Sequence, residues 1–408
     1  MDTRHYYDQG WEFIRKNDYA AAIETFNTAL AEAPDSYIIL EARGGAYQHI
    51  GEKEKALADY TRMIELAPKF PDGWNCRGNL YRNLGEYDKA IADFTQCIPM
   101  SPDNYGTYWS NRGISYYEKG DLDAALADFN KSLECWKDPE CSTWALFNRG
   151  LVWREKGDLD KALADFTLAA ARKPDDDELF YHAGYICFMQ KDYEKAIGWF
   201  SKAIAMNGNE ADYWLSRGVC YWNKSIKDNI NFWGEGGEII NQAEEDFTKA
   251  IECAPGMADA YLNRGTVRCS KARESRNLIK AIILEKVTDE ATRVLLMTQL
   301  GRTSGKDLIP QFDAILRGLR SNRDETEEIV AKFLVLFEND DAREAVEDLS
   351  RAIELDPNNA DAWYERGLAW TLLGERDKAI QDYEQACALD PNHKKAAAKR
   401  DELLENGN

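Results

Sequence analysis

The chain has 408 residues, 51 of them basic and 72 acidic, so its formal net charge at pH 7 is −21. This charge repels the phosphates of nucleic acids and of anionic membranes, so we expect neither as a partner and favour a protein or peptide of basic or apolar character. The nine cysteines are scattered and never spaced as CxxC, which argues against a disulfide framework or a zinc site and is typical of reduced thiols in a cytoplasmic protein.

The N-terminal sequence MDTRHYYDQGWEF has charged and aromatic residues where a signal peptide has an apolar run. From there a unit of about 34 residues recurs, each with a glycine, an alanine twelve residues later and a large ring or leucine four further on, once two insertions are allowed for. The glycines are Gly10, Gly44, Gly78, Gly113, Gly150, Gly184, Gly218, Gly265 and Gly367. A fixed period of this length predicts stacked repeats rather than separate domains.

Each unit has two runs of apolar residues at helical spacing, the first around the glycine and the second around the alanine. In the third unit, for example, Trp74, Gly78 and Tyr81 are followed by Ala90 and Phe94. A proline closes most units because it cannot continue a helix. We therefore predict an all-α fold in which the glycine lets the two helices approach closely and the alanine fills the same gap.

In chain order, the pattern predicts seven repeats over residues 3–257, with a loop insertion at about 228–240 inside the seventh. It then predicts the first helix of repeat eight at 258–271, a helical insertion at 272–340, the second helix of repeat eight at 341–359, repeat nine at 360–393, and a capping helix and tail at 394–408. The loop insertion is expected to be mobile and to present Phe232 and Trp233.

The sequence of the insertion at 272–340 predicts four amphipathic helices, near residues 273–286, 290–300, 308–320 and 325–337. Its stretch from Ala272 to Arg323 has ten basic and six acidic residues, a local excess of four positive charges in an acidic chain. It could cover the acidic repeats, recruit a second partner, or be a decoration without function.

The repeated unit GxxYxxxGxYxKAIxDFTKAIELxP resembles the tetratricopeptide repeat, with its small residue, alanine and proline at that family's places. The resemblance covers nearly the whole chain. It implies a right-handed superhelical solenoid of about nine helix-turn-helix repeats, whose concave groove is lined by the first helix of each repeat.

An arginine precedes the glycine in seven units, and an aspartate occupies a fixed place in the second helix of the same seven. The first and sixth units lack both residues, having Gln9 with Thr25 and Ala183 with Trp199. This joint presence and absence predicts that each arginine pairs with the aspartate of its own unit. The alternative, a ladder of arginines for an acidic ligand, is less favoured because each charge already has a partner.

The resemblance also implies which residues face the groove. Asparagines occur there at Asn79, Asn111, Asn148 and Asn263, where they could pair with a peptide backbone or be ordinary solvated residues. Large side chains occur where the family usually has polar ones, and they predict a stripe that binds a partner or is covered by the chain itself, or else unusual core packing. These residues are Tyr117, Trp144, Phe147, Tyr181, Tyr185, Phe188 and Trp222, with His182 beside them as a polar contact.

Relatives that grip the C-terminal carboxylate of a chaperone do so with lysines, an arginine and two asparagines. Here Asn79 and Asn111 stand at the two asparagine places, but Asn75, Trp144 and Asn148 stand where the cations are required, so we do not expect such a clamp.

The four histidines are far apart, and no HExxH, GxSxG or GxGxxG motif occurs, so we expect no catalytic residue, metal or cofactor. The sequence thus predicts a scaffold that binds an extended peptide or partner segment in the groove. The alternative is a regulatory or substrate-adaptor subunit of a separately encoded enzyme, with the insertion at 272–340 as a docking or autoinhibitory element.

Overall fold

The computed structural model describes residues 3–100, 106–135, 139–232, 234, 236–286, 293, 296–297 and 341–405, and within these ranges it contains helices and turns but no strand. The helices are α1 (Thr3–Arg15), α2 (Tyr19–Glu32), α3 (Tyr37–His49), α4 (Lys53–Leu66), α5 (Pro71–Asn83), α6 (Tyr87–Met100), α7 (Gly106–Lys119), α8 (Leu122–Cys135), α9 (Pro139–Glu155), α10 (Leu159–Arg172), α11 (Asp177–Met189), α12 (Tyr193–Met206), α13 (Ala211–Lys227), α14 (Glu238–Cys253), α15 (Ala258–Lys286), α19 (Asp341–Leu355), α20 (Ala360–Leu373), α21 (Arg376–Leu389) and α22 (Lys394–Glu405). The predicted all-α fold is confirmed.

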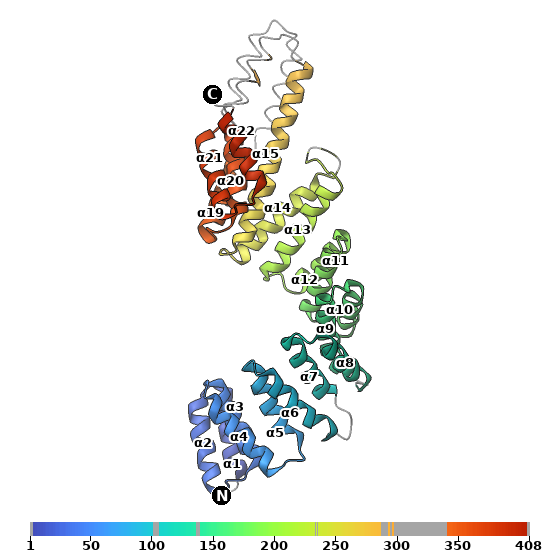
Figure 1. The fold of residues 1–408 in the computed structure, drawn as a ribbon, viewed down its shortest axis with the longest axis vertical. Coiled ribbons are helices and arrows are strands. Elements are labelled where there is room, and N and C mark those ends of the chain that lie inside the picture. Colours follow the sequence, from blue (N-terminus) through green and yellow to red (C-terminus); the bar gives the residue numbers. More distant parts are fainter. Residues whose placement is uncertain are drawn as a thin grey trace. The chain divides into compact units, whose positions relative to one another are not determined.

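The chain divides into two compact units, Met1–Ile186 and Cys187–Asn408, and the boundary falls inside α11. Within the first unit, α1 packs on α2, α3 on α4, α5 on α6, α7 on α8 and α9 on α10 (Figure 1). Within the second, α13 packs on α14, α15 on α19 and α20 on α21, while α22 packs on α21. Each helix pair also packs on the next pair of its unit, as helix-turn-helix repeats require.

The repeated glycines bring the two helices of each pair together, as predicted, but the side chain that fills the gap is different. A Cβ added to Gly44 would lie 2.5 Å from Cε1 of Tyr60, and the same holds for the equivalent ring or leucine in the other repeats for which the structure gives this contact. The alanine one turn earlier, such as Ala56, is fully buried but does not lie over the glycine. Glycine is therefore required because an aromatic ring of the second helix occupies the place of its side chain.

A residue in the left-handed region ends the first helix of many pairs. Seven residues after Gly44 and Gly367 stand Gly51 (φ 80°) and Gly374 (φ 79°). The same place is taken by Asn17 (φ 58°) in the first pair. A left-handed residue closes the turn within which the second helix begins, so this short turn keeps both helices of a pair in contact.

All seven predicted arginine–aspartate pairs form. In each, Nε and Nη2 of the arginine donate to the two carboxylate oxygens at 2.6–2.9 Å, and the aspartate is almost fully buried. The pairs are Arg43–Asp59, Arg77–Asp93, Arg112–Asp128, Arg149–Asp165, Arg217–Asp246, Arg264–Asp348 and Arg366–Asp382. Each pair joins the first helix of a repeat to its second.

The same arginines also reach the preceding repeat, which the sequence analysis missed. In each of the seven, Nη1 donates to a side-chain oxygen of the preceding second helix at 2.6–3.2 Å. The acceptors are Asn27, Thr61, Thr95, Asn130, Ser201, Thr248 and Ser350. A signal was present in the sequence, because each acceptor directly follows the ring or leucine of its repeat.

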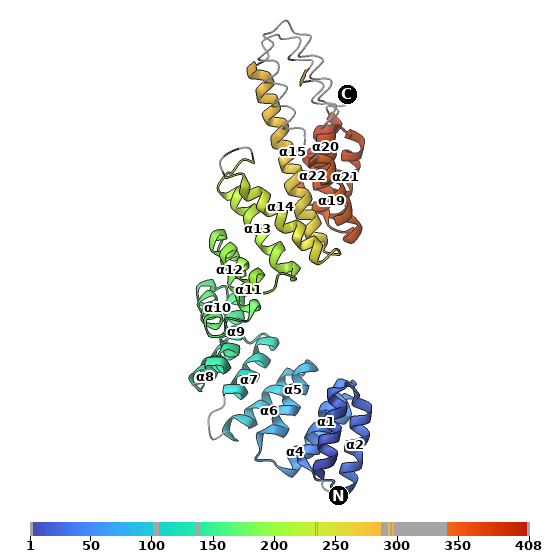
Figure 2. The same ribbon diagram turned by 180° about the vertical axis from the view of Figure 1, so that it is seen from behind.

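The described residues of the two insertions differ from the predictions made for them. Helix α15 runs unbroken from Ala258 to Lys286, so the predicted start of the insertion at residue 272 is not a helix boundary. No glycine or proline follows Gly265 within α15, and nothing there would break it. Both views show α15 beside α19 and α20 (Figures 1 and 2). The three further helices predicted for the insertion lie outside the described residues, except for residues 293, 296 and 297.

The loop between α13 and α14 does not present Phe232 as predicted. The ring of Phe232 is half-buried against the cluster of Ile240 and Phe247, with Nζ of Lys271 4.6 Å from its centre. Its backbone N–H donates to the Glu274 carboxylate on α15 at 2.7 Å. The prediction was wrong because α15 is long enough to supply both contacts. Trp233 lies outside the described residues.

Two adjacent glycines in α3 allow a test of the close approach between α3 and α4. A Cβ on Gly44 meets Tyr60, whereas a Cβ on Gly45 meets nothing within 4 Å. We expect Gly44→Ala to lower the free energy of unfolding by about 1–3 kcal/mol through overpacking. Gly45→Ala should leave it unchanged or raise it by up to about 1 kcal/mol, because alanine favours helix. Urea unfolding of the full chain measures both, and equal stability of the two variants would contradict the role given to Tyr60.

The pair of Arg77 and Asp93 allows a test of the arginine network. Removing one partner leaves the other charge buried, so we expect Arg77→Met and Asp93→Leu each to cost about 3–5 kcal/mol in the free energy of unfolding. The double variant should cost much less than the sum, which a double-mutant cycle measures. The exposed pair Lys55–Glu52 is the matched control and should give a coupling of no more than about 0.5 kcal/mol. Additive losses at Arg77 and Asp93 would show that the pair does not act as a unit.

Candidate functional site

A continuous stack of rings runs from the core of the first unit to its surface. On α9, Trp144 stacks on Phe147 with ring centres 5.9 Å apart. Phe147 meets the edge of His182 on α11 at 5.0 Å, and His182 in turn stacks on Phe166 of α10 at 5.3 Å. Phe166 is the ring that lies over Gly150. The stack therefore ties Trp144 to the contact that holds α9 and α10 together.

The outer end of this stack is exposed. Trp144 has 57% of its surface accessible, whereas Phe147 is half-buried beside Leu146 and Leu179. An indole that is both exposed and held in place from beneath loses little conformational freedom when a partner covers it. Trp144 thus has the properties of an anchor residue in an interface.

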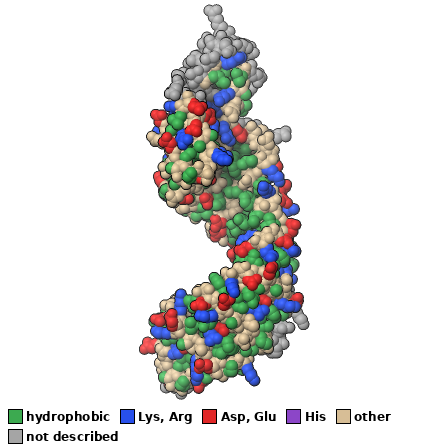
Figure 3. Space-filling model, in the orientation of Figure 1, with side chains coloured by type: hydrophobic (Ala, Val, Ile, Leu, Met, Phe, Trp, Pro, Cys, Tyr) green, Lys and Arg blue, Asp and Glu red, His purple; other side chains and the backbone are tan. Residues whose placement is uncertain are grey.

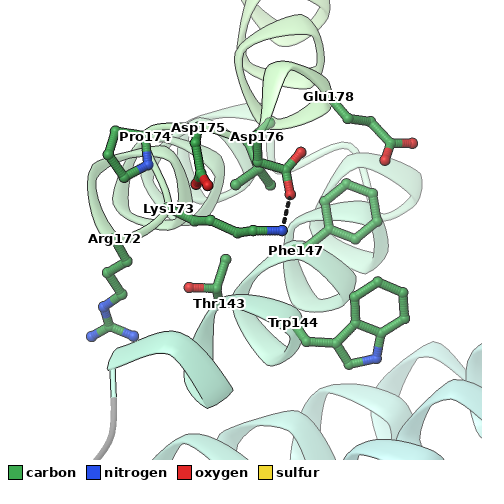
Figure 4. Close-up of a pocket in the computed structure, with 10 residues that line it drawn as sticks. Thr143, Trp144, Phe147, Arg172, Lys173, Pro174, Asp175, Asp176 and Glu178 are labelled. Carbon is green, nitrogen blue, oxygen red and sulfur yellow. Dashed lines mark hydrogen bonds and ion pairs between the residues drawn. The ribbon is translucent and has the colours of Figure 1, made fainter.

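A pocket of about 370 Å³ opens beside the exposed end of the stack (Figure 4). Trp144 and Phe147 of α9 lie on one side of it, and the segment from the end of α10 to the start of α11 lies on the other. The lining residues are Thr143, Trp144, Phe147, Arg172, Lys173, Pro174, Asp175, Asp176, Glu178 and Leu179.

The two cations of the pocket already have partners. Nζ of Lys173 lies 2.9 Å from Oδ2 of Asp176, which is the dashed line in Figure 4. Nη1 of Arg172 donates to the hydroxyl of Ser142. The charge of Lys173 is therefore balanced by Asp176, whereas Arg172 keeps its positive charge because its partner is an uncharged hydroxyl.

Two acids of the pocket, Asp175 and Glu178, are exposed. Nε2 of His182 lies 4.0 Å from Oε1 of Glu178 and pairs with it only when the imidazole is protonated. Burial, reinforced by the positive charge of Arg154, lowers the pKa of His182 from 6.5 to about 4. His182 is therefore neutral near pH 7, and Glu178 keeps an uncompensated negative charge at the mouth of the pocket.

The predicted asparagines are partly committed to bonds within the protein. Oδ1 of Asn75 accepts from Nδ2 of Asn79 at 3.4 Å and from Nδ2 of Asn111 at 3.0 Å, which links α5 to α7. Asn148 and Asn263 each donate to the backbone carbonyl one turn earlier, at 2.8 and 2.7 Å. Asn148 is moreover only 6% exposed. Asparagine capture of a peptide backbone stays a prediction, with Asn79 and Asn111 as its better candidates.

The other predicted aromatic residues do not share one environment. Tyr117 donates to Oε1 of Glu155 at 2.6 Å, and burial with this bond raises its pKa to about 12. Tyr181 and Tyr185 lie side by side on α11 with ring centres 6.5 Å apart, and Tyr185 is 38% exposed.

Two of the predicted aromatic residues belong to the second unit. Phe188 packs near Tyr193, with ring centres 6.0 Å apart, and Trp222 packs against the core around Phe247. Of the predicted stripe, the structure thus brings together Trp144, Phe147, Tyr181, His182 and Tyr185.

The acidic side of the pocket was missed by the sequence analysis, which looked at the groove places for asparagines and large aromatic side chains. Glu178 lies in α11, six residues before Gly184, the place that Trp144 takes before Gly150, whereas Asp175 lies in the loop between α10 and α11. A signal was available, because three aspartates in a row follow Pro174.

No cluster of three histidine, cysteine or acidic side chains suited to a metal ion occurs in the part of the chain that the structure describes. Within the same residues, no helix is both long and apolar enough to span a membrane.

Sequence models of the tetratricopeptide repeat match residues 7–71, 147–211 and 330–394, residues 71–104, and residues 106–134, which together make up well over half of the chain. A protein of Glycine max named Hsp70-Hsp90 organizing protein 1 is 26% identical over 204 residues, which are 48% of this chain and 33% of that protein. The chain thus spans about a third of the length of this curated relative.

Two solved structures are among those that match part of the chain. A tetratricopeptide repeat protein from Parabacteroides merdae is 22% identical, with a TM-score of 0.45, over 62% of this chain and 93% of that one. YrrB, described as a TPR protein with an unusual peptide-binding site, is 25% identical, with a TM-score of 0.36, over 46% of this chain and 94% of that one.

The buried imidazole gives a test of the ring stack. Because the pKa of His182 is lowered to about 4 in the folded state, the unfolded chain binds a proton between pH 4 and 6.5 that the folded chain does not. The contribution of His182 to stability is therefore fully present above pH 6.5 and is lost as the pH falls toward 4. We expect its NMR resonance, assigned with a His182→Gln variant, to titrate near pH 4. A midpoint near 6.5 would show that the imidazole is solvated and the stack open.

Proposed function

The chain belongs to the tetratricopeptide repeat family, and from that premise we propose that it is a non-enzymatic scaffold that binds an extended segment of a partner protein. The proposed surface is formed in the first unit by α5, α7, α9 and α11, the first helices of their pairs. The described residues on it are the asparagines of α5 and α7 and the aromatic stack of α9 and α11.

The observation that carries the proposal is the exposed Trp144 held on Phe147 and His182. Exposed apolar side chains that are singly placed on a surface are common, but a rigidly supported tryptophan beside a pocket is a typical anchor for a binding partner. Asn79 and Asn111 add amide groups that could pair with the backbone of an extended peptide.

His182 and two buried thiols are poorly suited to catalysis. His182 is packed among rings and neutral, so it is poorly placed as a general base for a substrate. Burial raises the pKa of the Cys97 and Cys220 thiols to about 12, so neither is a thiolate at neutral pH.

The partner that we propose is of basic or apolar character. The relative from Glycine max is named for Hsp70 and Hsp90, but the cations of a carboxylate clamp are replaced here by Asn75, Trp144 and Asn148, so we do not transfer that partner. The strongly acidic chain and the uncompensated Glu178 support a cationic partner instead.

A second candidate function is a regulatory or adaptor subunit of a separately encoded enzyme. It is favoured by one observation, which is that α15 continues past its own repeat and packs on α20. Nη1 of Arg276 donates to the backbone oxygen of Leu372 at 2.6 Å across that contact. Residues 272–340 would then be a docking or autoinhibitory element, carried on a helix that is part of the second unit.

Capture from native lysate with identification by mass spectrometry tests the proposed surface. We expect Trp144→Ala combined with Asn111→Ala to lose at least 90% of the partner signal that the wild-type chain retains, since each substitution removes a proposed contact while leaving the arginine pairs intact. Phe70→Ala is the matched control, because Phe70 is also highly exposed but lies in the loop before α5. Full retention by the double variant, with loss in a chain lacking residues 287–340, would favour the adaptor function instead.

A further inference from the structure

We infer that the pocket beside Trp144 takes an arginine side chain of the partner segment, with the guanidinium over the indole and its charge facing Glu178. This inference rests on the proposed function and specifies the partner chemistry at its anchor. The occupant is an arginine in an extended peptide.

The chain itself shows what a tryptophan combined with a carboxylate accepts. The guanidinium carbon of Arg77 lies 5.2 Å from the ring centre of Trp74 while the same group is bonded to both oxygens of Asp93. The same combination occurs at Trp109, Trp214 and Trp363, at 4.9, 5.0 and 4.8 Å. In each of the four cases, one planar cation satisfies an aromatic face and an acid together.

The pocket offers the same two groups without a resident guanidinium between them. Trp144 and Glu178 both line it, and the one arginine in its lining, Arg172, is bonded to Ser142 and points away from Trp144 in Figure 4. Lys173 is paired with Asp176. An exposed indole and an exposed acid thus line the same pocket, which suits a cation supplied from outside.

The side chains that line the pocket have a net negative charge. On the face of the first unit seen in Figure 3, acidic and basic side chains are interspersed, which is typical of a solvated surface. The pocket lining has three acids, Asp175, Asp176 and Glu178, and two cations, Arg172 and Lys173, which leaves one net negative charge. A cationic side chain is thus favoured over an acidic one by charge and over an aliphatic one by the open indole.

Arginine fits better than lysine for geometric reasons. A guanidinium is planar and can stack on Trp144 while its edge donates to Glu178, whereas an ammonium is a point charge with a larger hydration cost. A volume of about 370 Å³ lies at the small end of ligand pockets and accommodates one long side chain with its solvent.

The test uses degenerate peptide pools with one fixed central residue: arginine, lysine, citrulline, glutamate or phenylalanine. Citrulline keeps the shape of arginine and removes its charge. The full chain is immobilised and the retained fraction of each pool is measured. We expect the arginine pool to be retained about tenfold more than the citrulline pool and several-fold more than the lysine pool, and the preference to weaken at high salt.

Variants assign the preference to the pocket. Trp144→Ala and Glu178→Gln should each bring the ratio of arginine to citrulline pools close to one, while Glu54→Gln, an exposed acid on α4, should leave it unchanged. Both pocket residues are exposed, so the thermal unfolding midpoint should stay within a few degrees of that of the wild type.

The outcomes separate this inference from the function on which it rests. If no pool is retained, the proposed peptide-binding function itself is overturned. If pools are retained without a preference for arginine, or if the preference survives both pocket variants, peptide binding stands and the arginine pocket is wrong. A preference for glutamate would instead assign the pocket to Arg172 and Lys173.

Discussion

In seven of the repeats one arginine connects three helices, and the packing of those repeats in both units depends on this arrangement. In the third repeat, Arg77 bonds both oxygens of Asp93 on its own second helix and the hydroxyl of Thr61 on the preceding one. Removing two charges from water offsets much of their attraction, so such pairs are weak sources of net stability. Their main effect is on specificity, because a helix in the wrong register would leave a buried aspartate without its partner. Hydrophobic packing alone tolerates such shifts between nearly identical repeats.

The same constraint explains why the fold could be predicted from the sequence and where prediction stopped. The spacing of the glycines and the joint occurrence of arginine and aspartate depend only on which residue stands at each place of the repeat. Both can therefore be seen in the sequence. That Tyr60 rather than Ala56 fills the gap at Gly44 depends on side-chain direction, which the period does not give. The unbroken α15 and the packing of Phe232 depend on contacts that occur in one repeat alone. A pattern shared by all repeats therefore cannot predict them.

The candidate site was predictable in part for the same reason. Trp144 and Phe147 depart from the usual polar residues at their places in the family pattern, and that departure pointed to them correctly as neighbours. Glu178 takes the same place before Gly184 that Trp144 takes before Gly150, so the repeat pattern could have indicated it, whereas Asp175 lies in the loop before α11 and has no place in that pattern. Asn148 shows the opposite error: it occupies a place assigned to the groove, yet it is buried and bonded to the backbone of its own helix. Position within a repeat gives the face of a helix but not the partner of a side chain.

The sixth repeat is where the regular pattern is replaced by a different one. It lacks the arginine and the aspartate, and the boundary between the two compact units falls in its first helix, α11. The same helix supplies His182, which packs on Phe147 and Phe166 and thereby supports Trp144 from beneath. Seven repeats have an arginine–aspartate pair between their two helices, whereas this helix has Ala183 in place of the arginine, and His182 just before it packs against rings. A neutral, buried imidazole avoids the desolvation cost of an unpaired charge and leaves the nearby Glu178 uncompensated.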